Sequence, residues 1–99
     1  MHCLTATYPE PDDAAAFKAY YEQKHVPLAR TLPGLKRCSF AYPEPLRPGP
    51  VPFCVFRAWF DDAQSMFAAL ESEIGQTVAA DVPNYSPKGV SLYHHATED

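Results

Sequence analysis

The run Phe53-Cys54-Val55-Phe56-Arg57-Ala58-Trp59-Phe60 is the sequence feature that most restricts how this chain can fold. Its β-branched and aromatic residues favour a strand, in which successive side chains point to opposite faces of a sheet. Both sets of side chains are apolar apart from Arg57, so we expect both faces of this strand to be covered. The chain therefore needs a layer of structure on each side of its sheet.

The segments around this run predict the rest of a small α+β domain. Alternating side chains predict strands over residues 1–8, 35–42 and 89–94. One helix is predicted from Asp12 or Asp13 toward the Pro33-Gly34 turn. A second helical segment is predicted from Asp61 or Asp62 to Val82, with a new start at Ser72. The order β-α-β-β-α-β is the split βαβ, or ferredoxin-like, arrangement, whose four-stranded antiparallel sheet carries its helices on one face. A symmetric homodimer that stacks two open faces would complete a dimeric α+β barrel.

Chain length, charge and cysteine usage exclude several classes of function. A chain of 99 residues suits one domain, spanning residues 1–99. A net charge of −4, with eight Lys and Arg that do not cluster, argues against a nucleic acid or an anionic membrane as partner. We find no apolar run near the ~18 residues that cross a bilayer and no signal peptide, so we expect a cytoplasmic protein. Cys3, Cys38 and Cys54 are interpreted as small buried hydrophobic residues, with Cys54 the exception if it faces a cavity.

The first predicted helix carries the main candidate for chemistry. His25 lies about 80° from Phe17 on a helical wheel, at the border of the apolar stripe. Pro27 has no N–H to donate, so the carbonyl of Gln23 loses its partner and the helix must kink or restart around His25 and Val26. Two roles stay open for His25. It either caps a frayed helix end, or its ring enters the space beneath the helix and performs acid/base chemistry, because imidazole titrates near neutral pH.

Residues 43–52 hold five prolines and one glycine, so no regular element is expected there. The segment is longer than a tight hairpin needs. It forms a rim over a pocket, reaches toward a partner subunit, or merely connects two strands.

Two segments of the chain are similar to a known family. The first segment is Phe17-x-x-Tyr20-Tyr21-x-x-x-His25-x-Pro27-Leu28 followed by Leu32-Pro33-Gly34-Leu35. The second is Trp59-Phe60-Asp61-Asp62, followed after a short helix by Gly75-Gln76-x-Val78-Ala79-Ala80-Asp81-Val82-Pro83-Asn84-Tyr85. Together they resemble the EthD family, named after a protein of ethyl tert-butyl ether degradation, within the dimeric α+β barrel superfamily. The resemblance implies a ferredoxin-like protomer, a homodimeric barrel, and a pocket between the sheet and the helices that the family's helix histidine, here His25, would line.

The resemblance leaves the chemistry open, because related barrels include cofactor-free lactone isomerases, polyketide cyclases and monooxygenases. One hypothesis is a cofactor-independent enzyme, of isomerase, cyclase, lyase or oxygenase type, acting on a small hydrophobic carbonyl or lactone compound with His25 as acid and base. Substrate-binding roles are expected for Tyr20 or Tyr21, as the group that polarises the oxygen, and for Arg57, as the partner of a substrate carboxylate. Phe53, Phe56 and Trp59 are expected as apolar walls. Tyr21 as a core aromatic and Arg57 as the partner of a neighbouring acid remain alternatives.

The second hypothesis is a non-catalytic protein that binds a small hydrophobic molecule or serves a degradation pathway. The same aromatic pocket would suit it. No cofactor and no metal are expected. His94 and His95 are adjacent and face opposite sides of a strand, although His2 would meet His94 if the first and last strands are neighbours. A glycine-rich phosphate loop and a G-x-S-x-G elbow are both missing from the sequence.

Overall fold

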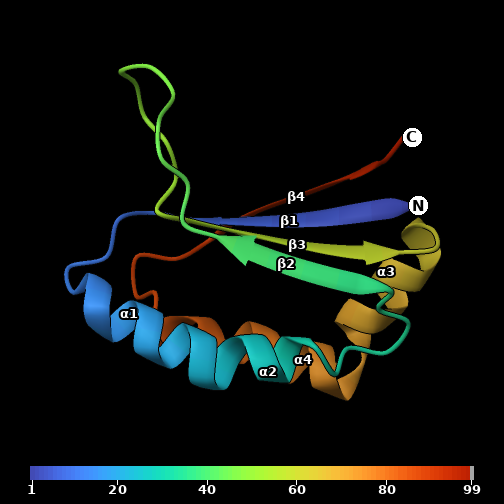
Figure 1. The fold of residues 1–99 in the computed structure, drawn as a ribbon. Coiled ribbons are helices and arrows are strands. Elements are labelled where there is room, and N and C mark those ends of the chain that lie inside the picture. The colour runs from blue at the N-terminus through green and yellow to red at the C-terminus, as the bar shows by residue number, and fades with distance from the viewer. Residues whose placement is uncertain (99) are drawn as a thin grey trace.

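The computed structural model describes residues 1–98 and has two layers, a sheet and a set of helices that all lie on one side of it (Figure 1). The four strands run antiparallel to their neighbours in the order β2-β3-β1-β4, with bounds β1 His2–Tyr8, β2 Arg37–Ala41, β3 Cys54–Phe60 and β4 Ser91–Ala96. The helices are α1 Ala14–Tyr20, the π-helix η1 Tyr21–His25, α2 Val26–Ala29, α3 Ala63–Glu71, α4 Glu73–Asp81 and the 3-10 helix η2 Val82–Asn84.

The predicted α+β, ferredoxin-like order of elements is confirmed. The predicted domain over residues 1–99 ends at Asp99, which lies outside the described residues. Within residues 1–98, no helix is both long enough and apolar enough to cross a membrane.

Short polar side chains begin the helices where the sequence predicts. The Asp13 carboxylate accepts a hydrogen bond from the Ala16 N–H at 2.9 Å and so caps α1. Asp62 caps α3 in the same way, and Ser72 ends α3 and caps α4. The sharp junction between α3 and α4 needs a glycine, because a Cβ on Gly75 would lie 2.3 Å from the backbone oxygen of Ala69.

The predicted disturbance near Pro27 takes the form of a π turn. The Val26 N–H donates to the carbonyl of Tyr21, five residues back, and residues Tyr21–His25 form η1. A π turn widens the helix locally, and such turns are frequent at functional sites. Pro27 then lies in the first turn of α2, where a missing N–H is tolerated.

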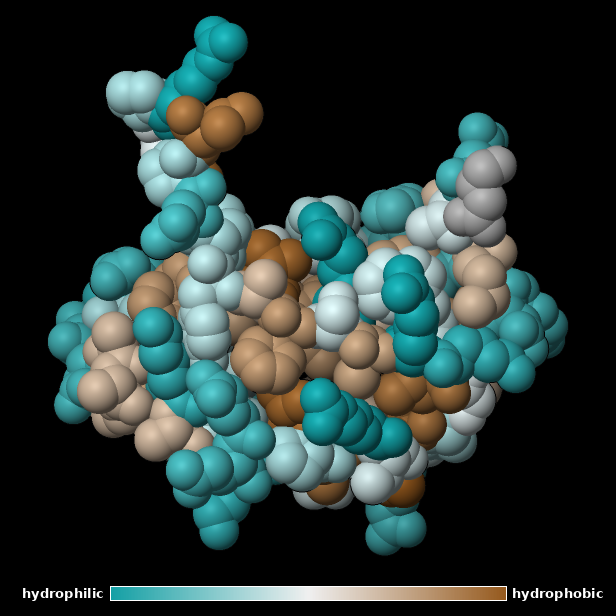
Figure 2. Space-filling view, viewed as in Figure 1, coloured by the Kyte–Doolittle hydropathy of each residue, from teal (hydrophilic) through white to brown (hydrophobic). Residues whose placement is uncertain are grey.

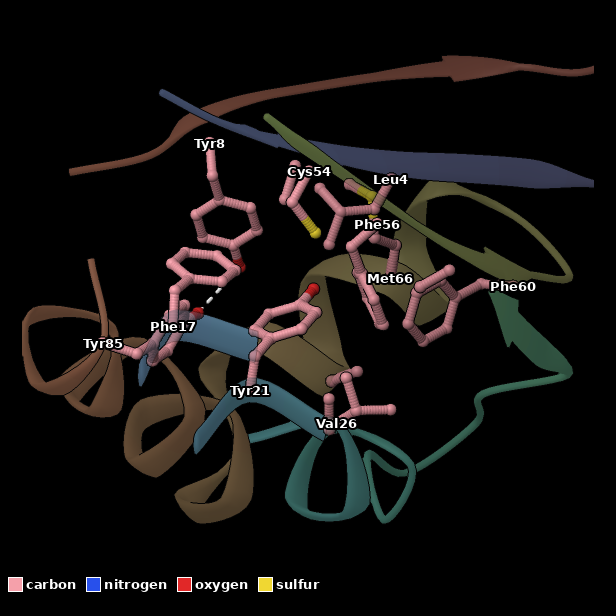
Figure 3. Close-up of a cluster of buried hydrophobic side chains, with 14 residues drawn as sticks. Leu4, Tyr8, Phe17, Tyr21, Val26, Cys54, Phe56, Phe60, Met66 and Tyr85 are labelled. Atoms are coloured by element: carbon pink, nitrogen blue, oxygen red, sulfur yellow. Dashed lines mark hydrogen bonds between the residues drawn. The ribbon is translucent and has the colours of Figure 1, made fainter. Parts of the chain in front are cut away.

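The core lies between the helices and the side of the sheet that faces them (Figure 3). Even-numbered residues of β1 and β3, such as Leu4, Tyr8 and Phe60, point toward the helices and are buried. They pack against Phe17, Tyr21, Val26 and Ala29 of the helical segments between β1 and β2, and against Met66 and Ala69 of α3, which follows β3. Cys3 and Cys54 are buried free thiols and Cys38 is half-buried, and burial raises the pKa of Cys54 to about 11.

The other face of the sheet, here called the open face, carries no helix (Figure 1). Trp59 is half-buried there because the Arg37 guanidinium lies 3.9 Å from its ring centroid. Arg57 is exposed on the same face, and all six residues of β4 are exposed. Residues 43–52, here called the arm, rise on the open-face side, away from the helices.

We expect Gly75→Ala to lower the free energy of unfolding by about 1–3 kcal/mol, because the added methyl group overlaps backbone atoms that cannot move independently. Urea denaturation followed by circular dichroism measures this change. The matched control is Gly49→Ala, whose Cβ would meet its nearest neighbour at 3.9 Å. Equal stabilities for the two variants would contradict the tight junction between α3 and α4.

Candidate functional site

A cavity of about 350 Å³ lies between the helices and the sheet. Leu4, Ala6 and Tyr8 of β1 and Phe56 of β3 form its floor, while residues of α2, α4, η2 and β4 form its walls. His25 and Tyr8 supply the polar side-chain atoms of the lining, and the remaining lining residues are apolar. Both the volume and the apolar character suit a small organic molecule.

The His25 ring is fixed at the end of the π turn, and only 4% of the residue is exposed. Its Nδ1 lies 2.9 Å from Oδ2 of Asp81, at the end of α4. The Tyr21 ring stacks on the imidazole with a centroid separation of 5.5 Å, and the Tyr85 ring lies 4.5 Å away. The imidazole is therefore held on two sides by aromatic rings and at one nitrogen by a carboxylate.

Asp81 is held in turn by two further donors. Its Oδ1 accepts hydrogen bonds from the Tyr20 hydroxyl at 2.6 Å and from the Asn84 side-chain amide at 2.9 Å. A carboxylate in the last turn of a helix is unfavourable for the helix dipole, so α4 gains nothing from an aspartate at this position. The three hydrogen bonds to its side chain account for its presence and fix its orientation toward His25.

Burial lowers the pKa of His25, and the hydrogen bond to Asp81 opposes this change only in part. Burial raises the pKa of Asp81, but the hydrogen bonds from Tyr20, Asn84 and His25 together outweigh it and hold this pKa below its usual value. Near neutral pH the carboxylate is therefore charged and the imidazole is neutral. The charged carboxylate can only accept, so Nδ1 carries the proton and donates it, and Nε2 keeps its lone pair.

The Nε2 atom is available for chemistry. It makes no hydrogen bond to any group within residues 1–98, and the ring to which it belongs lines the cavity. A neutral imidazole with one nitrogen bound to a carboxylate and the other free can accept a proton there and can return it.

The sequence-predicted tyrosines lie beside His25 but outside the cavity lining. Tyr20 contacts the site through Asp81. Tyr21 is fully buried in the core, as its alternative interpretation had it, and its hydroxyl has no hydrogen-bond partner within residues 1–98. Neither hydroxyl is placed to polarise an oxygen in this cavity.

Phe56 lies in the floor of the cavity, as predicted for an apolar wall, whereas Phe53, Trp59 and Arg57 lie away from it. Phe53 packs on Phe17 at 5.0 Å and on Tyr42 at 5.6 Å, at the base of the arm. Trp59 and Arg57 are odd-numbered residues of β3 and therefore point to the open face, opposite to the helices. Arg57 also has no salt bridge to a neighbouring acid among the described residues.

Sequence reasoning missed Tyr8, Asp81, Asn84 and Tyr85. A usable signal existed for Asp81, because an acid at the end of a helix and just before a proline is unfavourable unless its side chain has another partner. The run Asp81-Val82-Pro83-Asn84-Tyr85 was recognised as part of a motif, but no role was assigned to it. Tyr8 had no comparable signal, because alternation places it on a face without saying which face borders a cavity.

Two further histidines, outside the cavity, contact each other where β4 pairs with β1. His2 of β1 and His94 of β4 approach at 2.9 Å between Nε2 and Nδ1, as expected if the first and last strands are neighbours. Within residues 1–98, no three side chains of His, Cys, Asp and Glu are grouped so that they could hold a metal ion.

Comparison with known proteins identifies the family. The sequence model of the EthD domain matches residues 10–89. The chain belongs to the EthD family. An uncharacterized 11.0 kDa protein in the thcB-thcC intergenic region of Rhodococcus erythropolis is 33% identical over 93 residues, which are 93% of this EthD chain and 90% of that relative.

Solved structures share the EthD fold. The crystal structure of an ethyl tert-butyl ether d (EthD) family protein from Bacillus halodurans superposes with a TM-score of 0.88 at 25% identity, covering 99% of each chain. A dimeric ferredoxin-like protein of unknown function from Thermobifida fusca superposes with a TM-score of 0.74 at 14% identity, covering 97% of this chain and 90% of that one.

The free energy of unfolding should decrease as the pH falls from about 7.5 to about 5, because unfolding releases His25 to its ordinary, higher pKa and lets it take up a proton. His25→Gln removes this contribution and should flatten the profile, as measured by urea denaturation at several pH values. The exposed residue His95 provides the control, and His95→Gln should keep the wild-type slope. If His25→Gln also kept the wild-type slope, the conclusion that His25 is buried and neutral in the folded protein would be wrong.

Proposed function

We propose that this EthD-family chain is a cofactor-independent enzyme that moves a proton on a small, apolar carbonyl or lactone compound, with His25 as the acid and base. The observation that carries the proposal is the 2.9 Å contact between His25 Nδ1 and Asp81 Oδ2 at the wall of an apolar cavity of about 350 Å³. This contact fixes the tautomer that leaves Nε2 free, and the apolar lining of the cavity offers a substrate few competing polar groups.

The reaction needs no oxidant or reductant. His25 Nε2 removes a proton from the carbon next to a carbonyl group, and the electron pair of the broken C–H bond moves onto the carbonyl oxygen as an enolate forms. The imidazolium that results is stabilised by the charged Asp81 carboxylate. Return of the proton to a different atom of the substrate completes an isomerisation or prepares a ring closure. Proton transfer of this kind contributes about 10²–10⁴-fold to a rate.

Tyr8 is the group we assign to the substrate oxygen. It lines the cavity, and its hydroxyl lies 2.7 Å from the Tyr85 hydroxyl. Burial raises the pKa of Tyr8, so it stays protonated at neutral pH. When Tyr85 donates to Tyr8, the Tyr8 proton is free for an enolate oxygen. In this proposal Tyr20 is a positioning residue that holds Asp81.

The proposal includes a homodimer in which two open faces meet. Its support is the exposure of Tyr93, which is 50% exposed, and of Ser91 and His95, which share the open face because they pair with odd-numbered residues of β1, together with the half-buried Trp59 on the same face. The Thermobifida fusca protein of the same fold is itself named as dimeric. Association through this face would bury apolar groups that one protomer leaves in water.

A second candidate is a non-catalytic protein that binds a small hydrophobic molecule. The observation that favours it is the scarcity of polar groups in the cavity, which has no charged side chain in its lining. Apolar side chains bind a ligand equally well before and during a reaction, so such a lining gives affinity without accelerating a chemical step.

Proton exchange in heavy water separates the two candidates. Wild-type protein should accelerate the exchange of α-protons in a panel of small cyclic ketones and lactones, followed by proton NMR. His25→Gln should lower that rate on the order of 10²-fold while saturation-transfer NMR still detects the ligand, because the cavity volume is preserved. Asp81→Asn should lower the rate as well, and His95→Gln should not. Binding without exchange in the wild type would favour the non-catalytic protein.

The role of Tyr8 has its own matched test. Tyr8→Phe and Tyr85→Phe both remove the hydrogen bond between the two hydroxyls, but only Tyr8 lines the cavity. We expect Tyr8→Phe to lower the exchange rate by about tenfold or more relative to Tyr85→Phe, because only Tyr8 would donate to the developing oxyanion. Equal losses would mean that the hydroxyl pair acts only on stability.

A further inference from the structure

The arm, residues 43–52, is anchored at its base and free at its tip. At the base, the Tyr42 hydroxyl donates to the Glu22 carboxylate at 2.7 Å, and the Phe53 N–H donates to the Tyr8 carbonyl at 2.8 Å. At the tip, Leu46 is 97% exposed. Figure 1 shows the arm standing clear of the body on the open-face side of the sheet.

The composition of the arm keeps it extended. Five of its ten residues are proline, which fixes the backbone φ angle and lowers the conformational entropy that docking would cost. The arm also carries exposed apolar side chains, because Val51 is 45% exposed in addition to Leu46. Figure 2 shows this hydrophobic group, in brown, held away from the rest of the surface. An extended segment with an apolar tip is suited to dock on another surface.

Within one protomer, the tip of the arm packs on none of the other large exposed apolar side chains, because Leu46 is 97% exposed. Those large hydrophobic residues belong to the start of the chain, β4 and the helices next to it, namely Met1, Phe67, Ile74, Leu92 and Tyr93. Phe67 packs against His94 of β4 at a centroid separation of 5.4 Å. In the sheet order β2-β3-β1-β4, the arm connects β2 to β3 while β4 forms the opposite edge. The exposed side chain of Leu92, on the helix side of β4, thus lies at the sheet edge opposite to β2.

The length of the arm matches the thickness of a second sheet. An extended proline-rich chain rises about 3.1 Å per residue. The five residues from Tyr42 at the base of the arm to Leu46 at its tip therefore span about 15 Å when extended. Two sheets packed face to face lie about 10 Å apart. If a second copy covers the open face, the arm of one protomer is therefore long enough for its tip to pass the plane of the partner's sheet and to lie beside the edge of that sheet.

We propose that the arm docks on a second copy of this chain, with Leu46 packed against the β4 edge around Leu92 of the partner subunit. Two-fold symmetry makes the contact twice, since the arm of each protomer meets the β4 edge of the other. Leu92 lines the cavity that holds His25 and is itself 63% exposed, so the docked arm covers the mouth of the partner's cavity. The proposal rests on the homodimer proposed above and is independent of the chemistry assigned to His25.

The dimer dissociation constant tests the arm directly. Sedimentation velocity over a range of concentrations should show that Leu46→Asp weakens the dimer on the order of tenfold or more, as expected for an apolar anchor of an interface. The control is Glu44→Gln in the same arm, which should change the constant by no more than about twofold. Leu46 is almost fully exposed in the protomer, so its substitution leaves the protomer fold unchanged, which circular dichroism checks.

The docking position is tested with photoreactive p-benzoylphenylalanine in place of Leu46. Irradiation of a mixture of ¹⁴N-labelled and ¹⁵N-labelled protein, followed by mass spectrometry, should give mixed-label peptides that join the arm to the segment containing Leu92. Cross-links within one chain, or at a different part of the partner, would overturn the proposal. A wild-type dimer that Leu46→Asp leaves unaffected overturns the arm contact alone, whereas a monomeric wild type overturns the homodimer as well.

Discussion

The hydrogen bond between His25 and Asp81 joins the helical segment that follows β1 to the helical segment that follows β3. His25 ends the π turn that follows α1, and Asp81 ends α4, so a single 2.9 Å contact links residues that lie 56 positions apart in the sequence. The aromatic rings of Tyr21 and Tyr85 enclose the same imidazole. These contacts therefore set the packing of the two helical segments, the orientation of the His25 ring and its protonation state together.

The apolar cavity and this polar contact depend on each other. In water, an imidazole and a carboxylate at this distance would exchange partners with solvent and gain little from their attraction. Beside an apolar cavity, burial keeps the imidazole neutral, while three donors keep the carboxylate charged. The result is a neutral imidazole whose free nitrogen belongs to a ring that lines the cavity, with the carboxylate charge at the other ring nitrogen.

Local signals predicted most of the fold, whereas relationships across the chain were harder to predict. Capping residues and alternating side chains were sufficient to locate the elements, and Pro27 was sufficient to predict an irregular helix next to His25. The strand Cys54–Phe60 was harder, because both of its faces are largely apolar and alternation does not say which face meets the helices. Trp59 and Arg57 were consequently expected at the cavity although they lie on the open face. The local signal at Asp81 indicates that its carboxylate has a partner, but it does not identify His25 as that partner.

The buried hydroxyl of Tyr21 shows that the core is not optimised for stability alone. A hydroxyl group that is removed from water and left without a partner costs about 1–3 kcal/mol, and phenylalanine would fill nearly the same volume without that cost. The ring that carries this hydroxyl stacks on the His25 imidazole with a centroid separation of 5.5 Å. Position 21 therefore orients the imidazole at a cost in stability, and a tyrosine there ties the packing of the core to the geometry of His25.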